Sequence, residues 1–268
     1  MNTQATTTLD EGVSVDGLRE QRVGNVVVLT LDRPHARNAI NIELAQCLND
    51  AIDAIEADPS VWAVVLAATA PVFCAGADLR VINEGRISEL NIGDAGLAGL
   101  VGRDRRTPVI AAIDGPAFAG GCELVLACDL VVASTSASFA LPEVKRGLVA
   151  GAGGLFRMGQ KVPPNIAMQA LLTGEPISAE RAAGFGLVNV LCEPGTVLER
   201  SLELAEQICA NAPLAVQESR EVAVRSAGSE SAAWALSDAA MEKVLASNDV
   251  VEGVQAFLDK RPAQWTGS

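Results

Sequence analysis

Two glutamates and a pair of glycines are the residues of this chain with the clearest chemical use. Gly120 and Gly121 stand just before Glu123, and Glu143 comes twenty residues later, directly after Pro142. Glycines leave backbone N–H groups accessible. Such donors stabilise an enolate-like oxygen, while carboxylates beside it move protons. The pattern therefore predicts an enzyme that transfers protons next to a stabilised oxyanion.

A second glycine turn, Ala75-Gly76-Ala77-Asp78, offers another backbone donor. Taken alone, this turn is also typical of a helix start with Asp78 in its first turn, and Gly120-Gly121 is also typical of helix entry or close packing. Taken together, we expect the two sites to place two N–H groups around a single oxygen. A helix N-terminus at one of them would favour developing negative charge.

Both glutamates have apolar sequence neighbours. Glu123 belongs to the helix-like run 122–127, and Glu143 lies between Pro142 and Val144. A carboxylate in such surroundings is costly to bury without partners or a purpose. Burial can push the protonation states of two carboxylates apart, which supplies an acid and a base at neutral pH. For Glu143, a structural salt bridge to Lys145 or Arg146 is an alternative interpretation.

Other chemistries have little support. His35 is the only histidine and lies in a basic loop, so a catalytic triad or histidine-bound metal is not favoured. The run 151–154 (Gly-Ala-Gly-Gly) lacks the Gly-Lys-Ser/Thr that completes a phosphate loop. The six cysteines are scattered without CxxC spacing, and we interpret most of them as small core residues of a reducing compartment. We expect no metal.

Composition narrows the function classes. The chain has 268 residues, 49% of them hydrophobic and 20% charged, which fits a globular enzyme. A net charge of −13 argues against nucleic acid as a partner. The first residues show no signal peptide and no run is apolar enough to span a membrane, so we expect a cytoplasmic protein. Three basic groups are each either a site for one phosphorylated ligand or a solvated patch: Arg33/Arg37, Arg103/Arg105/Arg106 and Lys260/Arg261.

Strand and helix patterns alternate over residues 13–195, which indicates an α/β core. A hairpin is expected at 18–23 and 26–32, and Asn41 is placed to cap the helix that follows. Residues 82–99 are polar and rich in glycine, and we interpret them as a mobile specificity loop. The remaining expected elements of the core are strands at 61–67, 109–113, 130–133 and 138–141 and a buried helix at 121–128.

Residues 196–268 have a different pattern, with helical apolar spacing throughout. We expect helices at 198–210, 214–226, 231–247 and 250–258. Their apolar faces must pack on the core or across subunits. The alternative is a monomer whose helices fold back on their own core.

These motifs, in this order, resemble the enoyl-CoA hydratase/isomerase (crotonase) family from about Val13 to Trp265. Each motif is weak alone, but the ordered set is specific. The matching runs are Arg33-Pro34 with Arg37-Asn38-Ala39, 73–79, 115–123, Cys128-Asp129, 139–143, 151–154 and 184–188.

The resemblance implies an α/β fold made of a spiral of ββα units, with a C-terminal helical region that forms trimers, usually paired into hexamers. It implies a coenzyme A thioester as substrate and no separate cofactor. By position, Ala77 and Gly120 would donate the oxyanion-hole N–H groups, Glu123 and Glu143 would be catalytic, and Gly151 would support the water. The implied CoA-binding residues are Arg33, Arg37, Asn38, Ala39, Ile40, Ala75, Asp78, Leu79, Phe257 and Lys260, the last two in some cases from a neighbouring subunit.

Hydratases of this family carry both glutamates, as this chain does, so the resemblance favours an enoyl-CoA hydratase. A Δ3,Δ2-enoyl-CoA isomerase that uses Glu143 alone is the first alternative. The run Ser138–Leu141 followed by Pro142-Glu143 is also similar to carnitinyl-CoA dehydratases, which act on a polar acyl group, and a silent acyl-CoA binder is the least favoured reading.

The chain departs from the family at two places near the expected pocket. Ala150 stands where proline is usual, and Leu155-Phe156 replace a polar pair. We expect these residues to border the pocket and to bear on the acyl group more than on the reaction.

Overall fold

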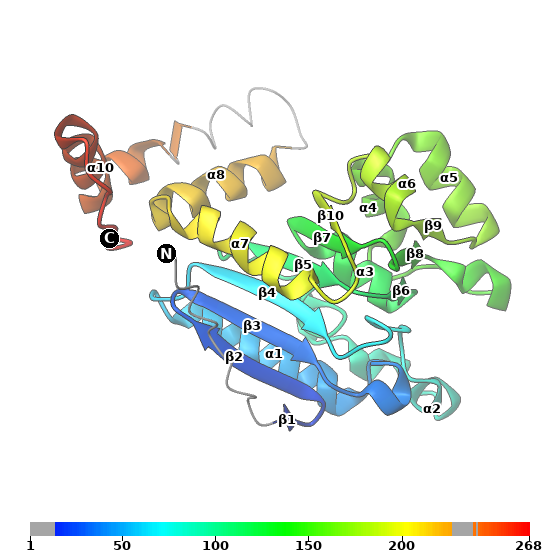
Figure 1. Ribbon diagram of the computed structural model, residues 1–268. Coiled ribbons are helices and arrows are strands. Elements are labelled where there is room, and N and C mark those ends of the chain that lie inside the picture. The colour runs from blue at the N-terminus through cyan, green and yellow to red at the C-terminus, as the bar shows by residue number, and fades with distance from the viewer. Residues whose placement is uncertain (1–13, 227–237, 240) are drawn as a thin grey trace.

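The fold is built around a seven-stranded sheet, as the computed structural model shows for residues 14–226, 238–239 and 241–268 (Figure 1). In spatial order its strands are β1 (Ser14–Val15), β2 (Leu18–Val23), β3 (Val26–Leu31), β4 (Ala63–Ala68), β5 (Val109–Ile113), β7 (Leu130–Ser134) and β10 (Val190–Cys192). The predicted hairpin forms, with Val23 paired to Val26. From β3 onward the strands are parallel. Parallel strands are buried on both faces, which explains their unbroken apolar sequences.

A smaller second sheet carries the chemistry-bearing segments. It consists of β6 (Pro116–Phe118), β8 (Ser138–Ala140) and β9 (Ile177–Ser178). Strand β6 was not expected, because Asp114-Gly115-Pro116 reads as a chain stop. Its parallel pairing with β8 places the residues after both strands at one edge of this sheet. Glu123 and Glu143 follow β6 and β8, so this pairing brings them together.

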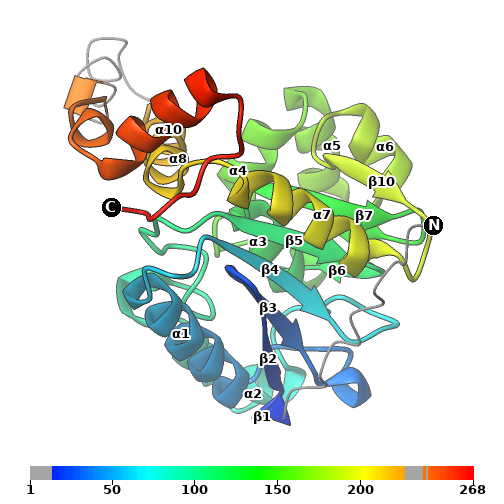
Figure 2. The ribbon, with the colours of Figure 1, turned by 60° about the vertical axis from the view of Figure 1, so that its left-hand side comes forward.

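Helices cover both faces of the large sheet (Figures 1 and 2). On one face α1 (Ile42–Ala57), capped by the Asn41 side chain as predicted, packs its buried leucines and isoleucines on the strands. On the other face lies α7 (Val197–Cys209), which buries Val197 and Ala205 against strand residues such as Val65 and Ile110. Although α7 falls within 196–268, it completes the core of its own chain.

The remaining helices surround this frame. They are α2 (Leu79–Asn83), α3 (Gly120–Ala127), α4 (Gly154–Lys161), α5 (Pro164–Thr173), α6 (Ala179–Gly184), α8 (Pro213–Arg225) and α10 (Asn248–Asp259), with 3-10 turns η1 (Pro34–Ala36), η2 (Ile87–Leu90), η3 (Gly93–Ala95) and η4 (Pro142–Arg146). Helices α7, α8 and α10 match three of the four C-terminal helices expected. Of the fourth, expected at 231–247, residues 231–237 and 240 lie outside the described residues, and the described part is helical at 238–239 and 241–245.

A partly buried carboxylate attaches α8 to the core. Asp129 pairs with Arg105 at 2.6 Å and with Arg220 of α8 at 2.9 Å. Arg105 also donates to the carbonyls of Thr107 and Ala127. Arg103 pairs with Asp53, and Arg106 donates to the side-chain oxygen of Gln217. The basic group Arg103/Arg105/Arg106 is therefore used within the fold and is not a ligand patch.

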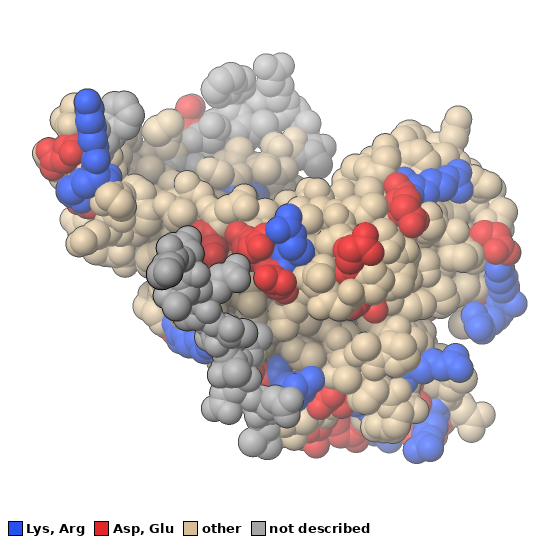
Figure 3. Space-filling model, in the orientation of Figure 1, with Lys and Arg blue, Asp and Glu red and all other residues tan. Residues whose placement is uncertain are grey.

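Charges of both signs are mixed on the face seen in Figure 3, where acidic side chains lie along α7 beside a few basic ones. This pattern agrees with the net negative charge. Among the described helices, none is long and apolar enough to cross a membrane.

Candidate active site

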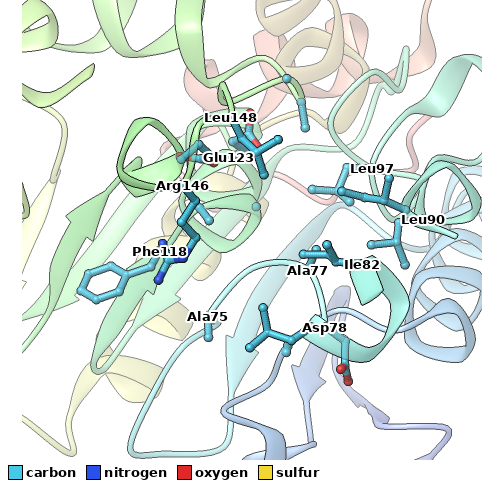
Figure 4. Close-up of a pocket in the computed structure, with 18 of the residues that line it drawn as sticks. Ala75, Ala77, Asp78, Ile82, Leu90, Leu97, Phe118, Glu123, Arg146 and Leu148 are labelled. Carbon is cyan, nitrogen blue, oxygen red and sulfur yellow. The ribbon is translucent and has the colours of Figure 1, made fainter. Parts of the chain in front are cut away.

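A cavity of about 1000 Å³ lies where the turn before α2, the start of α3 and the η4 segment converge (Figure 4). Both glutamates line it, as do Ala77, Gly120 and Gly151. The residues that the sequence pointed to are thus brought to one place from four separate segments.

The backbone N–H groups of Ala77 and Gly120 lie close together. A Cβ placed on Gly120 would be 3.7 Å from the Ala77 nitrogen and 3.6 Å from Cα of Gly76. Within the described chain, no backbone carbonyl accepts a hydrogen bond from either group. Gly120 is the first residue of α3, so the positive end of the helix dipole strengthens its N–H group as a hydrogen-bond donor. The two N–H groups can both donate a hydrogen bond to one oxygen of a ligand.

The approach of these two segments explains the glycines. Gly76 has φ +97°, and a Cβ there would lie 2.8 Å from the Cβ of Ala119. A Cβ on Gly121 would lie 2.3 Å from the Cys74 carbonyl oxygen. Ala119 itself has φ 51° and ψ −127°, a strained conformation for a residue with a side chain. Strain immediately before Gly120 is a mark of a functional turn.

Glu123 lies one turn into α3 and is almost fully buried. Its Oε1 accepts a hydrogen bond of 2.9 Å from the Gly154 N–H, the first residue of α4. Burial raises the pKa of the Glu123 carboxyl, and the charge of Glu143 raises it further, while the Gly154 and Ala152 N–H groups and Arg157 oppose the rise. The side chain is thus held at a fixed place with a pKa above its ordinary value.

Glu143 approaches the same cavity from η4. Its Oε2 is buried and has no hydrogen-bond partner among the described residues. Burial raises the pKa of the Glu143 carboxyl, against a smaller effect of Arg146. The alternative of a structural salt bridge to Lys145 or Arg146 is wrong, because neither pairs with Glu143 among the described residues, and Lys145 pairs with Glu175 at 2.7 Å. A carboxyl at a cavity whose buried oxygen has no partner among the described residues is suited to hold or deliver a proton.

Apolar side chains form much of the remaining wall, and sequence analysis missed them. In Figure 4, Ile82, Leu90 and Leu97 lie on the side of Ala77, facing Leu148 across the cavity. Three of these belong to the segment 82–99. The expectation of a mobile loop there is wrong in one respect: Leu90 and Leu97 are buried, and 3-10 turns order the segment. The apolar residues of the segment 82–99 follow no regular helical or strand spacing, so the sequence pattern did not indicate that Leu90 and Leu97 are buried.

The mouth of the cavity is basic. Arg33, His35, Arg37 and Arg80 line it together with Asp78. Arg33 pairs with Asp78 at 3.1 Å and also donates to the Ala39 carbonyl. Its positive charge is therefore partly balanced by contacts within the protein. Asp78 caps α2 through the Arg80 N–H. Arg37 and His35 remain exposed at the rim.

The expected CoA-binding residues fall into two groups. Arg33, Arg37, Ala39, Ala75, Asp78 and Leu79 line the cavity. Asn38 and Ile40 do not, because they support it from behind. Asn38 is fully buried and donates to the carbonyls of Thr69 and Val72 at 2.8 and 2.7 Å. Ile40 is buried in the core.

Phe257 and Lys260 lie in or just after α10, at the opposite end of the molecule from α2 (Figures 1 and 2). Lys260 does not line the cavity of its own chain.

The two departures from the family pattern are also placed by the structure. Ala150 is buried behind the cavity wall. Leu155 and Phe156 are exposed on α4 and line no part of the cavity, so the expectation that they border the pocket is wrong.

Comparison with known proteins agrees with this geometry. The model of the family described as "Enoyl-CoA hydratase/isomerase" matches residues 21–268. A carnitinyl-CoA dehydratase of Proteus mirabilis is 37% identical over 251 residues, which cover 91% of this chain and 96% of that protein. The crystal structure of an enoyl-CoA hydratase from Mycobacterium tuberculosis matches with a TM-score of 0.91 and 41% identity, over 95% of this chain and all of the other. A carnitinyl-CoA hydratase from Mycobacterium avium matches with a TM-score of 0.75 and 42% identity, at the same coverage.

The chain therefore belongs to the enoyl-CoA hydratase/isomerase family. Its mixed α/β core and C-terminal helices are those of crotonase-like structures, and it is an enzyme of the hydro-lyase class.

Proposed function

We propose that this enzyme is an enoyl-CoA hydratase, which adds water across the C2–C3 double bond of a trans-2-enoyl-CoA to give a 3-hydroxyacyl-CoA. The observation that carries the proposal is the juxtaposition of two partly desolvated carboxyls, Glu123 and Glu143, with the N–H pair of Ala77 and Gly120. A hydratase needs each of these four groups at one end of one cavity.

In the proposed reaction the thioester oxygen accepts hydrogen bonds from Ala77 and Gly120. Glu123 takes a proton from water as the water oxygen bonds to C3, and Glu143 gives its proton to C2. The electron pair of the C2–C3 π bond moves toward the thioester, where the two N–H groups stabilise it. Loss of one such donor typically costs about 3–4 kcal/mol in the barrier. Exchange of one proton with solvent returns both glutamates to their starting states.

The surroundings of the glutamates support these roles. Glu123 accepts the Gly154 N–H at the start of α4 and lies within the field of Arg157, both of which favour its ionised form. Glu143 has a buried oxygen that finds no hydrogen-bond partner in the described part of the chain, which favours its protonated form. Gly151 lies on the same wall and can hold the water.

We assign the CoA moiety to the basic mouth formed by Arg37, His35 and Arg80, with Ala39 and Ala75 offering backbone groups. Apolar side chains exposed on α10 and nearby, among them Leu245, Val251 and Leu258, support assembly of copies into a trimer or a pair of trimers. In that assembly Phe257 and Lys260 would reach a neighbouring copy's CoA. The function proposed here places the protein in the cytoplasm, with CoA supplied as part of the substrate and no separate cofactor.

Dehydration of carnitinyl-CoA is the second candidate, because the curated relatives bear that name. The cavity offers less for it. A quaternary ammonium is commonly recognised by several aromatic faces. Among the described residues, Phe118 is the only Phe, Trp or Tyr that lines the cavity, and Arg146 adds a cation. The wall of Ile82, Leu90 and Leu97 fits an apolar acyl chain better.

The decisive experiment measures hydration of trans-2-enoyl-CoAs of increasing chain length by the loss of enoyl absorbance. Crotonobetainyl-CoA and a 3-enoyl-CoA are measured in parallel. The proposal expects the highest kcat/KM for an apolar 2-enoyl-CoA. A higher value for crotonobetainyl-CoA would establish the second candidate, and isomerisation of the 3-enoyl-CoA without hydration would establish an isomerase.

A further inference from the structure

Arg157 stands next to the proton-transfer site without lining the cavity. It lies on α4, one turn after Gly154 and partly buried. Its Nη1 donates to the Ala152 carbonyl at 3.4 Å, and its Nη2 donates to the carbonyl of Val101. The guanidinium carbon is 4.9 Å from the centroid of the Phe156 ring. These contacts fix a cation at one place.

The glycine turn before α4 is shaped around this guanidinium. A Cβ on Gly153, whose φ is +96°, would lie 2.1 Å from Nη1 of Arg157. The next residue, Gly154, donates its N–H to Glu123, and a Cβ there would lie 3.1 Å from the Cγ of Glu123. The turn is thus held between the guanidinium on one side and the carboxylate on the other.

The same side chain connects the two walls of the cavity. Val101 ends the segment whose Leu97 approaches Gly120, with Cδ2 of Leu97 3.0 Å from a Cβ placed on that glycine. Through the carbonyls of Val101 and Ala152, Arg157 therefore joins the oxyanion-hole side to the Glu123 side.

From this geometry we infer that Arg157 is a positioning residue of the reaction: it holds the 151–154 turn against Glu123 and supplies the positive charge that keeps that carboxylate ionised as the base. The inference rests on the proposed hydratase function. It predicts an effect on proton transfer and none on CoA binding, since Arg157 does not line the cavity.

The charges around Glu123 agree with this role. Glu143 on η4 opposes ionisation of Glu123, Cys122 on α3 is a buried thiol whose pKa burial raises, and Arg157 on α4 favours ionisation. Burial lowers the pKa of Arg157, and the negative charge of Glu123 opposes this lowering. The Ala152 and Gly154 N–H groups are the remaining contributors.

The test is the pH profile of kcat/KM for a trans-2-enoyl-CoA in wild type, Arg157→Gln and Arg157→Lys. Without the cation, Glu123 ionises at higher pH, so the acid limb of Arg157→Gln should move up by about 0.5–1 pH unit. At any one pH on the acid side of the limb, kcat/KM of Arg157→Gln should be roughly three- to tenfold below that of wild type. This ratio corresponds to the same shift in pH. Arg157→Lys keeps the charge and should hold the acid limb near its wild-type position. The Kd of a saturated acyl-CoA should be unchanged in both.

Arg181→Gln is the matched control, because Arg181 is also stacked on a neighbouring phenylalanine, at 5.4 Å from the Phe185 ring, and its loss changes the net charge equally. An unmoved acid limb in Arg157→Gln would overturn the inference, and so would equal shifts in Arg157→Gln and Arg181→Gln. Should the Gln variant not fold, Arg157→Met replaces it. Arg157→Lys is a sufficient test by itself. If its acid limb is displaced although the positive charge is retained, the proposed role of the Arg157 charge is contradicted. Absence of hydration by wild type would instead refute the proposed function.

Discussion

The first N–H of helix α4, that of Gly154, donates to Oε1 of Glu123 across 2.9 Å. The Glu123 carboxylate thereby accepts a direct hydrogen bond and also interacts with the positive end of the α4 helix dipole. This contact gives Glu123 an orientation and an electrostatic bias that Glu143 lacks, since Oε2 of Glu143 is buried without a partner among the described residues. The asymmetry underlies the assignment of base and acid.

Replacing either glutamate by glutamine should remove most hydration while leaving thioester binding nearly intact. Proton-transfer groups typically contribute about 10²–10⁴-fold to rate. The measurement is kcat for Glu123→Gln and Glu143→Gln, together with the Kd of a saturated acyl-CoA. Glu199→Gln, an exposed position on α7, is the control. Hydration within a few-fold of wild type in both active-site variants would exclude the mechanism.

The same substitutions should make the fold more stable at high pH. Burial raises the pKa of both carboxyls, so between their ordinary and raised pKa values the folded chain binds more protons than the unfolded chain. Stability then falls as pH rises through that window. At pH values above this window, removing one carboxylate should raise Tm by about 1–3 °C. At pH values below the ordinary carboxyl pKa, the gain in Tm should vanish. Thermal melts of Glu143→Gln and wild type at pH 5 and pH 8.5 measure this, and a gain larger at the lower pH would contradict the sign.

Gly76→Ala should damage the oxyanion hole. The new Cβ would lie 2.8 Å from that of Ala119 and 3.1 Å from the Gly120 nitrogen, so both donor segments must shift. Loss of donor alignment typically costs about 10²–10³-fold in kcat. Gly85→Ala is the matched control, because its φ of +70° carries the same backbone strain with nothing within 4 Å. If the two variants retained equal activity, the placement of the thioester oxygen between Ala77 and Gly120 would need revision.

Arg37→Ala should weaken acyl-CoA binding and reduce its dependence on salt. Arg37 is exposed at the cavity mouth of a net-acidic protein, so the proposed contact with a CoA phosphate would be local and screened by ions. We expect Kd to rise several-fold at low salt and the difference to shrink at high salt. Arg22→Ala removes an arginine already paired with Asp58 and provides the comparison. An Arg37→Ala/Lys260→Ala double variant with unchanged affinity would count against this CoA site.

Charge introduced on the exposed apolar face of α10 should dissociate the assembly. Val251, Val254 and Leu258 are each more than half exposed in the single chain. Val251→Asp combined with Leu258→Asp would place carboxylates where we expect a subunit contact. Sedimentation at micromolar concentration should give an oligomer for wild type and smaller species for the variant. A wild type that sediments as a 27.7 kDa monomer would refute the assembly.

Sequence patterns predicted the elements whose causes are local. The Asn41 cap and the 18–23/26–31 hairpin depend on neighbouring residues and could be read directly. The site could be predicted where its glycines and carboxylates form an ordered set. Leu97 could not, because its burial depends on Gly120 and other distant residues rather than on a local period. Arg105 shows the same difficulty, since a basic residue does not reveal that its carboxylate partner comes 24 positions later.

The position of α7 has a consequence for synthesis on the ribosome. Strands β3, β4 and β5 are complete once Ile113 has emerged, yet the face that carries Val28, Val65 and Ile110 is covered only when α7 follows, after Val197. At typical translation speeds the interval is about four to seventeen seconds. During that time a nascent chain presents a continuous apolar surface, so a folding chaperone that shields it should raise the yield of soluble enzyme.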